Sequence, residues 1–405
     1  MKRILILVLV LLMALAPTAV FAKSDETPFV FCGELDQDTC DLLTQSQEAM
    51  KEVSSSVASS EIQLSLQNVP DFPIKDASGQ INLDTTSYVD TAFMQEVQDM
   101  MMGASDAMAE DMEGFMEDYL NMVVGIYSHM SFDAGVDIQL SDEVAEYISS
   151  QVGFDMPSDL TTEVRLVDGV MYINLDDISS ALPDLNIPTG WYGIEIAKLM
   201  ETQMASAMDQ MSNPSAETQA QMAGMMMGMS MANLGQNEEL QDALNTIVLL
   251  ERLDDNEVDG VPVAEIQSTI DFNALLTNET VLNLVFDMLK NSGQEIPQLD
   301  STNPAEVAGM LQLVAPMLTQ GLEWVQTSQI GLDDGYVYGE TMDMTWDMSS
   351  VIQLAAMGSG ERPARRPKEK TTFEMHVASS NSDFNDAPEI SAPEDAIIIP
   401  LDAMQ

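Results

Sequence analysis

Alternating apolar and polar positions mark several stretches as strands of an antiparallel sheet with one dry and one wet face. Residues 132–140 alternate without a break, and Ile62, Leu64 and Leu66 are separated by polar residues. Asp168-Gly169 is a strong short hairpin signal, so it predicts a turn between arms at 162–166 and 170–175. Further strands are expected at 79–84, 191–194, 258–272, 324–330, 336–348 and 373–377.

Between these strands the apolar spacing changes to three or four residues, which predicts amphipathic helices. They are expected at 34–58, 91–128, 143–151, 238–252, 274–291 and 304–320, with a further helical zone from 197 that Asn213-Pro214-Ser215 interrupts. Helical blocks alternate with pairs of strands and not with single strands. The predicted fold class is therefore α+β, with one large antiparallel sheet.

The N-terminus has the three parts of an export signal. Lys2 and Arg3 precede an apolar run over 4–15, and Val20-Phe21-Ala22 offers a small-residue cleavage site. The run is about half the length needed to span a bilayer, although an uncleaved anchor is the alternative. We expect residues 1–22 to be removed after Ala22 and the mature chain to function outside the cytoplasm. No later stretch is long and apolar enough to predict a transmembrane helix.

Two cysteines, Cys32 and Cys40, lie close together after this leader. In an oxidising compartment such a pair forms a disulfide, which would pin the mature N-terminus against the following helix. A two-thiol metal site is the alternative, but the only histidines are His129 and His376. Cys32 lies ten residues beyond Ala22, which is too far for a lipid-attachment signal.

The formal net charge is −53, because the chain has only 14 Lys and Arg residues against 67 Asp and Glu. Such a surface repels nucleic acid and anionic membranes, so neither is an expected partner. The exception is the basic Pro/Gly segment 358–370, which lies between two predicted strands. An exposed hairpin loop is the simpler interpretation, and a docking site for an acidic partner is the other.

The order of these features resembles the LolA/LppX-type lipoprotein-carrier superfamily. The resemblance spans about 33–400 and is carried by the segments 164–175, 191–192, 259–266 and 321–335 and by the terminal Pro393-Glu394-Asp395-Ala396. It implies that 23–405 forms a single domain. That domain would be a curved antiparallel sheet, an incomplete β-barrel, with helices packed on and capping its concave face over a hydrophobic cavity. The chain lacks the anchoring cysteine of many relatives, and the family supplies no binding residues by motif.

Catalytic signatures are absent from the sequence, so an enzyme is the least expected class and no cofactor is expected. With two histidines, a Ser-His-Asp or Cys-His site would need an improbable coincidence of folding. Acidic pairs such as Asp333-Asp334 are interpreted as solvated loop charges. Calcium binding at 254–257 is a minor alternative, because that segment lacks EF-hand spacing.

Methionine is the distinctive residue of the helical segments 94–130 and 200–232, which we interpret as insertions or enlarged lids. The simplest role is core packing; the second is an adaptable apolar surface over a ligand; the third is soft-metal binding, since thioethers ligate Cu(I). If a cavity exists, aromatic strand residues would line it. The candidate cavity or lid residues are Met225, Met226, Met229, Trp191, Trp324 and Trp346.

Taken together, the sequence predicts an exported, non-catalytic protein that binds or carries a lipid or other hydrophobic molecule under a half-barrel. One alternative is a ligand-free structural or interaction protein of the cell envelope. A second alternative is a Met-rich Cu(I)-binding protein. The sequence names no protein partner.

Overall fold

The computed structural model describes residues 30–70, 74–97, 99–100, 112–196, 198–200, 238–283, 304–358 and 370–400. The predicted leader 1–22, nearly all of the Met-rich segment 200–232 and most of the basic loop 358–370 lie outside these ranges. Met225, Met226 and Met229 are therefore outside the described residues.

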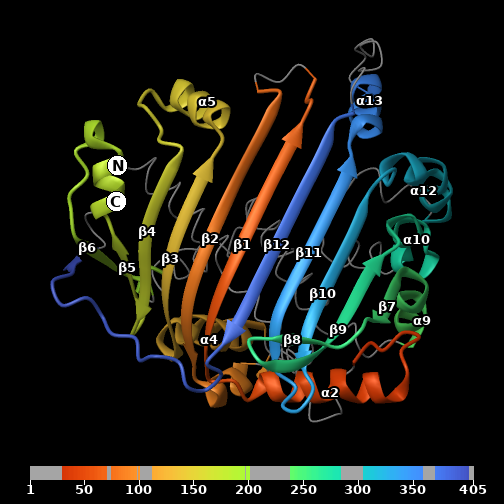
Figure 1. Ribbon diagram of the computed structural model, residues 1–405, viewed down its shortest axis with the longest axis horizontal. Helices are drawn as coiled ribbons and strands as arrows, with labels where there is room; N and C mark the ends of the chain where they lie inside the picture. The colour runs from red at the N-terminus through yellow and green to blue at the C-terminus, as the bar shows by residue number, and fades with distance from the viewer. Residues whose placement is uncertain are drawn as a thin grey trace.

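A single 13-stranded sheet forms the centre of the fold, with the order β13-β6-β5-β4-β3-β2-β1-β12-β11-β10-β9-β7 and with β8 paired to β9 (Figure 1). Every pairing is antiparallel except that of β13 with β6. The two ends of the sheet do not pair with each other. The predicted α+β class with an open, curved antiparallel sheet is confirmed. The strands are β1 Ser55–Gln67, β2 Asp76–Val89, β3 Met130–Leu140, β4 Asp159–Val167, β5 Val170–Asn174, β6 Trp191–Glu195, β7 Val248–Arg252, β8 Asn256–Val258, β9 Val261–Ile270, β10 Glu323–Gly331, β11 Val337–Asp347, β12 Thr372–Ser382 and β13 Ile397–Ile398.

Two-residue turns close two of the hairpins. Asp168 and Gly169 have φ of 52° and 73°, and Asp259 and Gly260 have φ of 49° and 86°. Positive φ at both central residues is the type I′ geometry, which matches the twist of the flanking strands. The predicted hairpin at Asp168-Gly169 is confirmed. The second turn lies near the start of the expected strand region 258–272 and separates β8 from β9.

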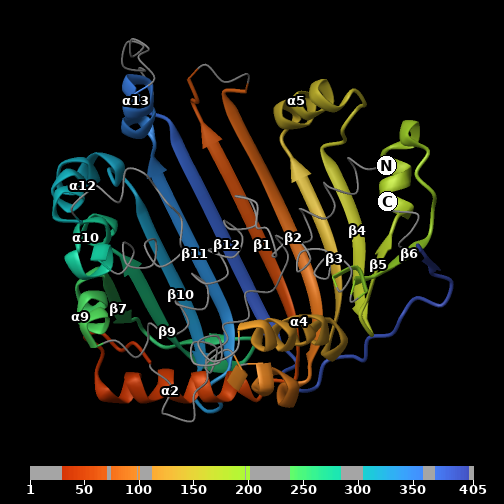
Figure 2. The ribbon, with the colours of Figure 1, turned by 180° about the vertical axis from the view of Figure 1, so that it is seen from behind.

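Helices connect these strands or lie at their ends. In Figure 2, α4 lies across the ends of the central strands, on the side turned toward the viewer. None of the described helices is long and apolar enough to cross a membrane. The helical elements are α2 Gln37–Lys51, α4 Met112–His129, α5 Asp142–Val152, α6 Asp176–Ala181, the 3-10 turn Pro183–Leu185, α9 Glu238–Ile247, α10 Phe272–Thr277, α12 Pro304–Leu318 and α13 Ser349–Gly358.

Two predicted helix boundaries differ from the structure. The helix expected at 238–252 ends at Ile247, because Val248–Arg252 pairs with β9 as strand β7. The helix expected at 34–58 ends at Lys51, and β1 begins at Ser55. In each case a short apolar run fits both periods, and strand pairing partners that are distant in sequence decide the outcome.

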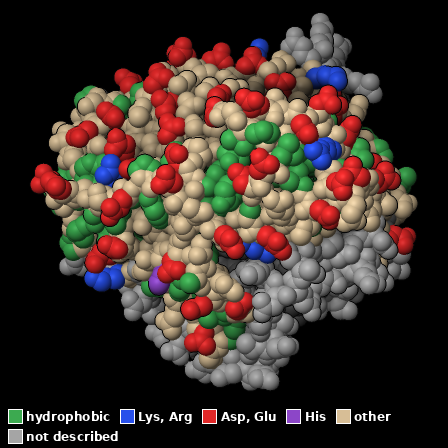
Figure 3. All heavy atoms as spheres, turned by 60° about the horizontal axis from the view of Figure 1, so that its bottom comes forward, with side chains coloured by type: hydrophobic (Ala, Val, Ile, Leu, Met, Phe, Trp, Pro, Cys, Tyr) green, Lys and Arg blue, Asp and Glu red, His purple; other side chains and the backbone are tan. Residues whose placement is uncertain are grey.

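The predicted disulfide is confirmed: Cys32 is bonded to Cys40, with their Cα atoms 5.4 Å apart. Cys40 lies in the first turns of α2, whose N-cap Asp36 accepts a hydrogen bond from the backbone N–H of Thr39 at 2.8 Å. The bond thus ties the segment before α2 to that helix. On the face that Figure 3 shows, Asp and Glu side chains are spread widely and Lys and Arg side chains are few.

Candidate functional site

The strand register assigns each side chain in the sheet to one of two faces, because directly opposed residues of antiparallel strands point the same way. Leu64 of β1 is opposite Met375 of β12, which is opposite Met344 of β11, which is opposite Trp324 of β10. Four apolar side chains from four strands thus form one row across the sheet. The intervening residues, such as Gln63, point to the other face.

Two neighbouring rows continue this apolar surface. Ile62 is opposite Val377, which is opposite Met342, and on the other side Leu66 is opposite Phe373, which is opposite Trp346. We call this surface the apolar strip. It consists of Ile62, Leu64, Leu66, Trp324, Met342, Met344, Trp346, Phe373, Met375 and Val377.

Buried clusters lie on the same face at both sides of the apolar strip. One joins Val136, Val164 and Ile173 from β3, β4 and β5. The other joins Leu42 of α2 to Ala264, Ile266 and Ile330 of β9 and β10. The strip between them is less buried: Val136 is 1% exposed and Leu64 is 39% exposed. A large leucine in the centre of a sheet is thus left in part without apolar contacts.

A polar row borders the apolar strip on the same face. Ser60, Ser379, Glu340 and Ser328 are opposed in turn across β1, β12, β11 and β10. The Ser328 hydroxyl donates to Glu340 Oε1 at 3.2 Å, and Gln326 Nε2 donates to the same oxygen at 3.4 Å. This row, which we call the polar border, places hydroxyl and carboxylate groups beside an apolar surface. That combination suits a molecule with one apolar and one polar end.

The three tryptophans that were predicted to line a cavity do not share one surface. Trp324 and Trp346 lie in the apolar strip, and Trp346 Nε1 donates to the backbone oxygen of Leu318 at 2.9 Å, next to the end of α12. Trp191 lies at the far side of the sheet on the opposite face. There the Arg165 guanidinium carbon lies 4.9 Å from the centre of the Trp191 ring.

Ionisable groups near the apolar strip have structural partners. Tyr338 of β11 donates to Asp334 Oδ2 at 2.7 Å, and burial, followed by this hydrogen bond, raises the pKa of Tyr338 to about 12. The tyrosine therefore stays neutral at physiological pH. Within the described ranges, no group of three or more His, Cys, Asp or Glu residues is arranged to hold a metal ion.

Sequence reasoning recognised the strand alternation in the apolar strip but not the strip itself. The pattern of alternation places Met342 and Met344 on one face of a strand, and Met375 on a face of another. No local sequence signal indicates that β12 pairs with both β1 and β11. The alignment of Leu64 with Met375 and Met344 could therefore not be predicted. Period-two methionines next to tryptophan in the same strand were the one available signal.

No protein-family model matches this sequence, and no curated protein matches it either. Solved structures similar to this chain include the lipoprotein LppX of Mycobacterium tuberculosis, which is 11% identical with a TM-score of 0.27, covering 87% of this chain and 98% of that one. LprF of Mycobacterium bovis is 8% identical with a TM-score of 0.28, covering 87% of this chain and 95% of that one. The expected LppX-type likeness is present. At these identities and scores the likeness concerns the fold alone.

Proposed function

We propose that this protein binds a lipid or another hydrophobic molecule against the apolar strip, without catalysis and outside the cytoplasm. The observation that carries the proposal is the row Leu64, Met375, Met344 and Trp324, in which Leu64 is 39% exposed between two buried clusters. Apolar surface left in this state gains free energy when a ligand covers it.

The physical basis is burial of the ligand's chain. Each methylene removed from water contributes about 0.8 kcal/mol. Methionine is unbranched and adapts its shape, so Met342, Met344 and Met375 suit chains of different shape. The polar border would meet the polar end of the ligand, where its hydroxyl groups donate and accept hydrogen bonds.

The proposed function requires export from the cytoplasm, and the disulfide supports export. A Cys32–Cys40 bond persists in oxidising compartments and is rare in the cytosol. The predicted cleavage after Ala22 remains part of the proposal. So does the role of Met225, Met226 and Met229 as part of a lid.

The test is native mass spectrometry of residues 23–405 purified from a lipid-containing host, followed by organic extraction and titration with palmitate. We expect a co-purifying lipid or palmitate uptake. The matched variants are Leu64→Glu and Gln63→Glu, which add the same charge at adjacent positions on opposite faces. Leu64→Glu should weaken palmitate binding at least tenfold, about 1.4 kcal/mol, whereas Gln63→Glu should not change it.

Two outcomes would reject the proposal. One is an apo mass with no palmitate uptake, which would favour a ligand-free structural or interaction protein. The other is equal loss of binding in both variants, which would place the ligand away from the apolar strip. Circular dichroism of each variant separates loss of binding from loss of folding.

A further inference from the structure

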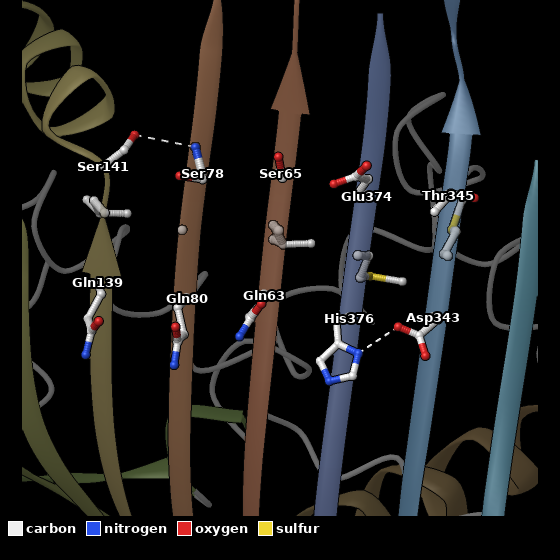
Figure 4. A pocket seen from close by; sticks show the side chains of 15 residues that line it. Gln63, Ser65, Ser78, Gln80, Gln139, Ser141, Asp343, Thr345, Glu374 and His376 are labelled. Carbon is white, nitrogen blue, oxygen red and sulfur yellow. Dashed lines mark hydrogen bonds and ion pairs between the residues drawn. The ribbon is translucent and has the colours of Figure 1, made fainter.

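The face opposite the apolar strip has a hollow of about 530 Å³ that crosses β3, β2, β1, β12 and β11 (Figure 4). It is lined by three consecutive residues from each of these strands: 139–141, 78–80, 63–65, 374–376 and 343–345. The side chains of the middle residues, apart from Gly79, point to the other face, so backbone forms the floor. We call this hollow the polar trough.

Two rows of polar side chains form the walls of the polar trough. The register aligns Gln139, Gln80, Gln63, His376 and Asp343 in one row. Three serines, a threonine and a glutamate form the other wall, and Figure 4 shows them on the opposite side of the floor. They are Ser141, Ser78, Ser65, Glu374 and Thr345.

The three glutamines are held away from the floor by hydrogen bonds along their own strands. Gln80 Nε2 donates to Asn82 Oδ1 at 3.0 Å, and Gln139 Nε2 donates to Asp137 Oδ1 at 3.1 Å. Gln63 Nε2 donates to the Glu61 carboxylate in the same way. Each acceptor lies two residues along the strand, on the side away from the serine row. The trough is therefore preorganised, and each amide keeps its carbonyl oxygen and second N–H for a ligand.

The His376 ring is oriented by a similar contact. Its Nδ1 lies 2.7 Å from Asp343 Oδ1, as the dashed line in Figure 4 shows. The other ring nitrogen, Nε2, does not take part in this contact. A ligand in the trough would thus meet amides, hydroxyls, one imidazole and two carboxylates.

The chemistry of these walls selects a class of ligand. None of the described residues that line the polar trough is Lys or Arg, and Asp343 and Glu374 repel anions. The apolar residues of each triplet point to the other face, so an acyl chain gains little here. Amides and hydroxyls both donate and accept hydrogen bonds, as sugar hydroxyls do. The spacing between five neighbouring strands gives a length of about 19 Å. We infer that the polar trough binds a neutral, hydroxyl-rich glycan chain.

The inference is tested by saturation-transfer NMR and calorimetry on residues 23–405, with cellotetraose and tetra-N-acetylchitotetraose as neutral probes and tetragalacturonate as the anionic one. We expect saturation transfer to at least one neutral probe and none to tetragalacturonate. Absence of binding by both neutral probes overturns the inference, and so does equal binding of the anionic probe.

Matched lysine variants locate the site. Ser65→Lys places a long side chain into the polar trough, whereas Ser59→Lys makes the same change on the same face of β1 outside it. Ser65→Lys should weaken binding of the neutral probe at least tenfold, and Ser59→Lys should leave it unchanged. Equal effects of the two variants overturn the inference. Palmitate uptake should survive in both, because the apolar strip lies on the other face, so this test is independent of the lipid proposal.

Discussion

The two faces of the central strands share one backbone but differ in what they offer to a partner. On β1, Ile62, Leu64 and Leu66 point to one face, and Glu61, Gln63 and Ser65 point to the other. The first face supplies the apolar strip, and the second supplies the polar trough. Since alternation has a period of two, a register shift of one residue would exchange them. Two independent binding surfaces can thus be encoded in the same strands.

A second contrast lies within the apolar face. Val136 and Ile266 share a transverse row with Leu83, Ser60, Ser379, Glu340 and Ser328. Val136 and Ile266, at the two ends of this row, are buried in clusters, whereas the centre of the row is the polar border. The buried clusters on either side of the polar border are therefore expected to contribute more to the stability of the fold than the centre, where the proposed ligand would bind. The following predictions test that division.

The largest effect is expected for a charge placed in a buried cluster. Val136 is 1% exposed, so Val136→Asp should destabilise the fold by more than about 3 kcal/mol, because an unpaired carboxylate is costly away from water. The measurement is urea denaturation followed by circular dichroism. Asp137→Ala, next to it on the polar face, should change the free energy of unfolding by less than about 0.5 kcal/mol. Similar decreases in the free energy of unfolding of both variants would contradict the expected difference in stability between the two faces.

The sequence predicted this difference between faces better than it predicted the ligand surfaces. Residues 132–140 alternate so regularly that β3 and its buried Val136 follow from the pattern alone. Asp168-Gly169 likewise gives the β4–β5 hairpin, because few other sequences adopt positive φ at two successive residues. Local signals of this kind do not depend on distant partners.

What the sequence could not supply was the pairing of strands far apart in the chain. β1 lies between β2, its neighbour in sequence, and β12, which is about 300 residues away. The apolar strip, the polar border and the polar trough all depend on the pairing of β1 with β12. The ambiguous run Val248–Arg252 depends similarly on β9, without which its pattern fits a helix. Long-range register, and not local propensity, is the missing information.

An intermediate effect is expected at Asp347, a carboxylate on the polar face whose side chain is only 12% exposed. Hydrogen bonding by Ser349, followed by Lys370 3.1 Å away, lowers the pKa of Asp347. A lowered folded-state pKa means that the carboxylate stabilises the fold above its unfolded pKa. That contribution is lost as the pH falls through the folded pKa. Asp347→Asn should therefore cost about 1 kcal/mol at neutral pH.

The control for Asp347 is Asp84→Asn, an exposed carboxylate on the same face. It should change the free energy of unfolding by less than about 0.5 kcal/mol. The difference between wild type and Asp347→Asn should shrink as the pH falls below the ordinary Asp value of 3.8. A difference that stays constant from neutral to acidic pH would show that the charge of Asp347 is not its source. Urea denaturation at a series of pH values measures this.

The smallest effect is expected when the methionines of the apolar strip are replaced together by leucine. If Met342, Met344 and Met375 act through apolar contact, the triple Met→Leu variant should bind palmitate within about threefold of wild type, because the exchange nearly conserves volume. If their thioethers are the functional groups, the variant should instead abolish tight Cu(I) binding measured by competition with a chromophoric chelator. Tight Cu(I) binding by the wild type that the triple variant loses, without palmitate uptake by the wild type, would assign the apolar strip to metal binding. Palmitate uptake that survives the exchange, with no tight Cu(I) binding in either protein, assigns it to apolar contact.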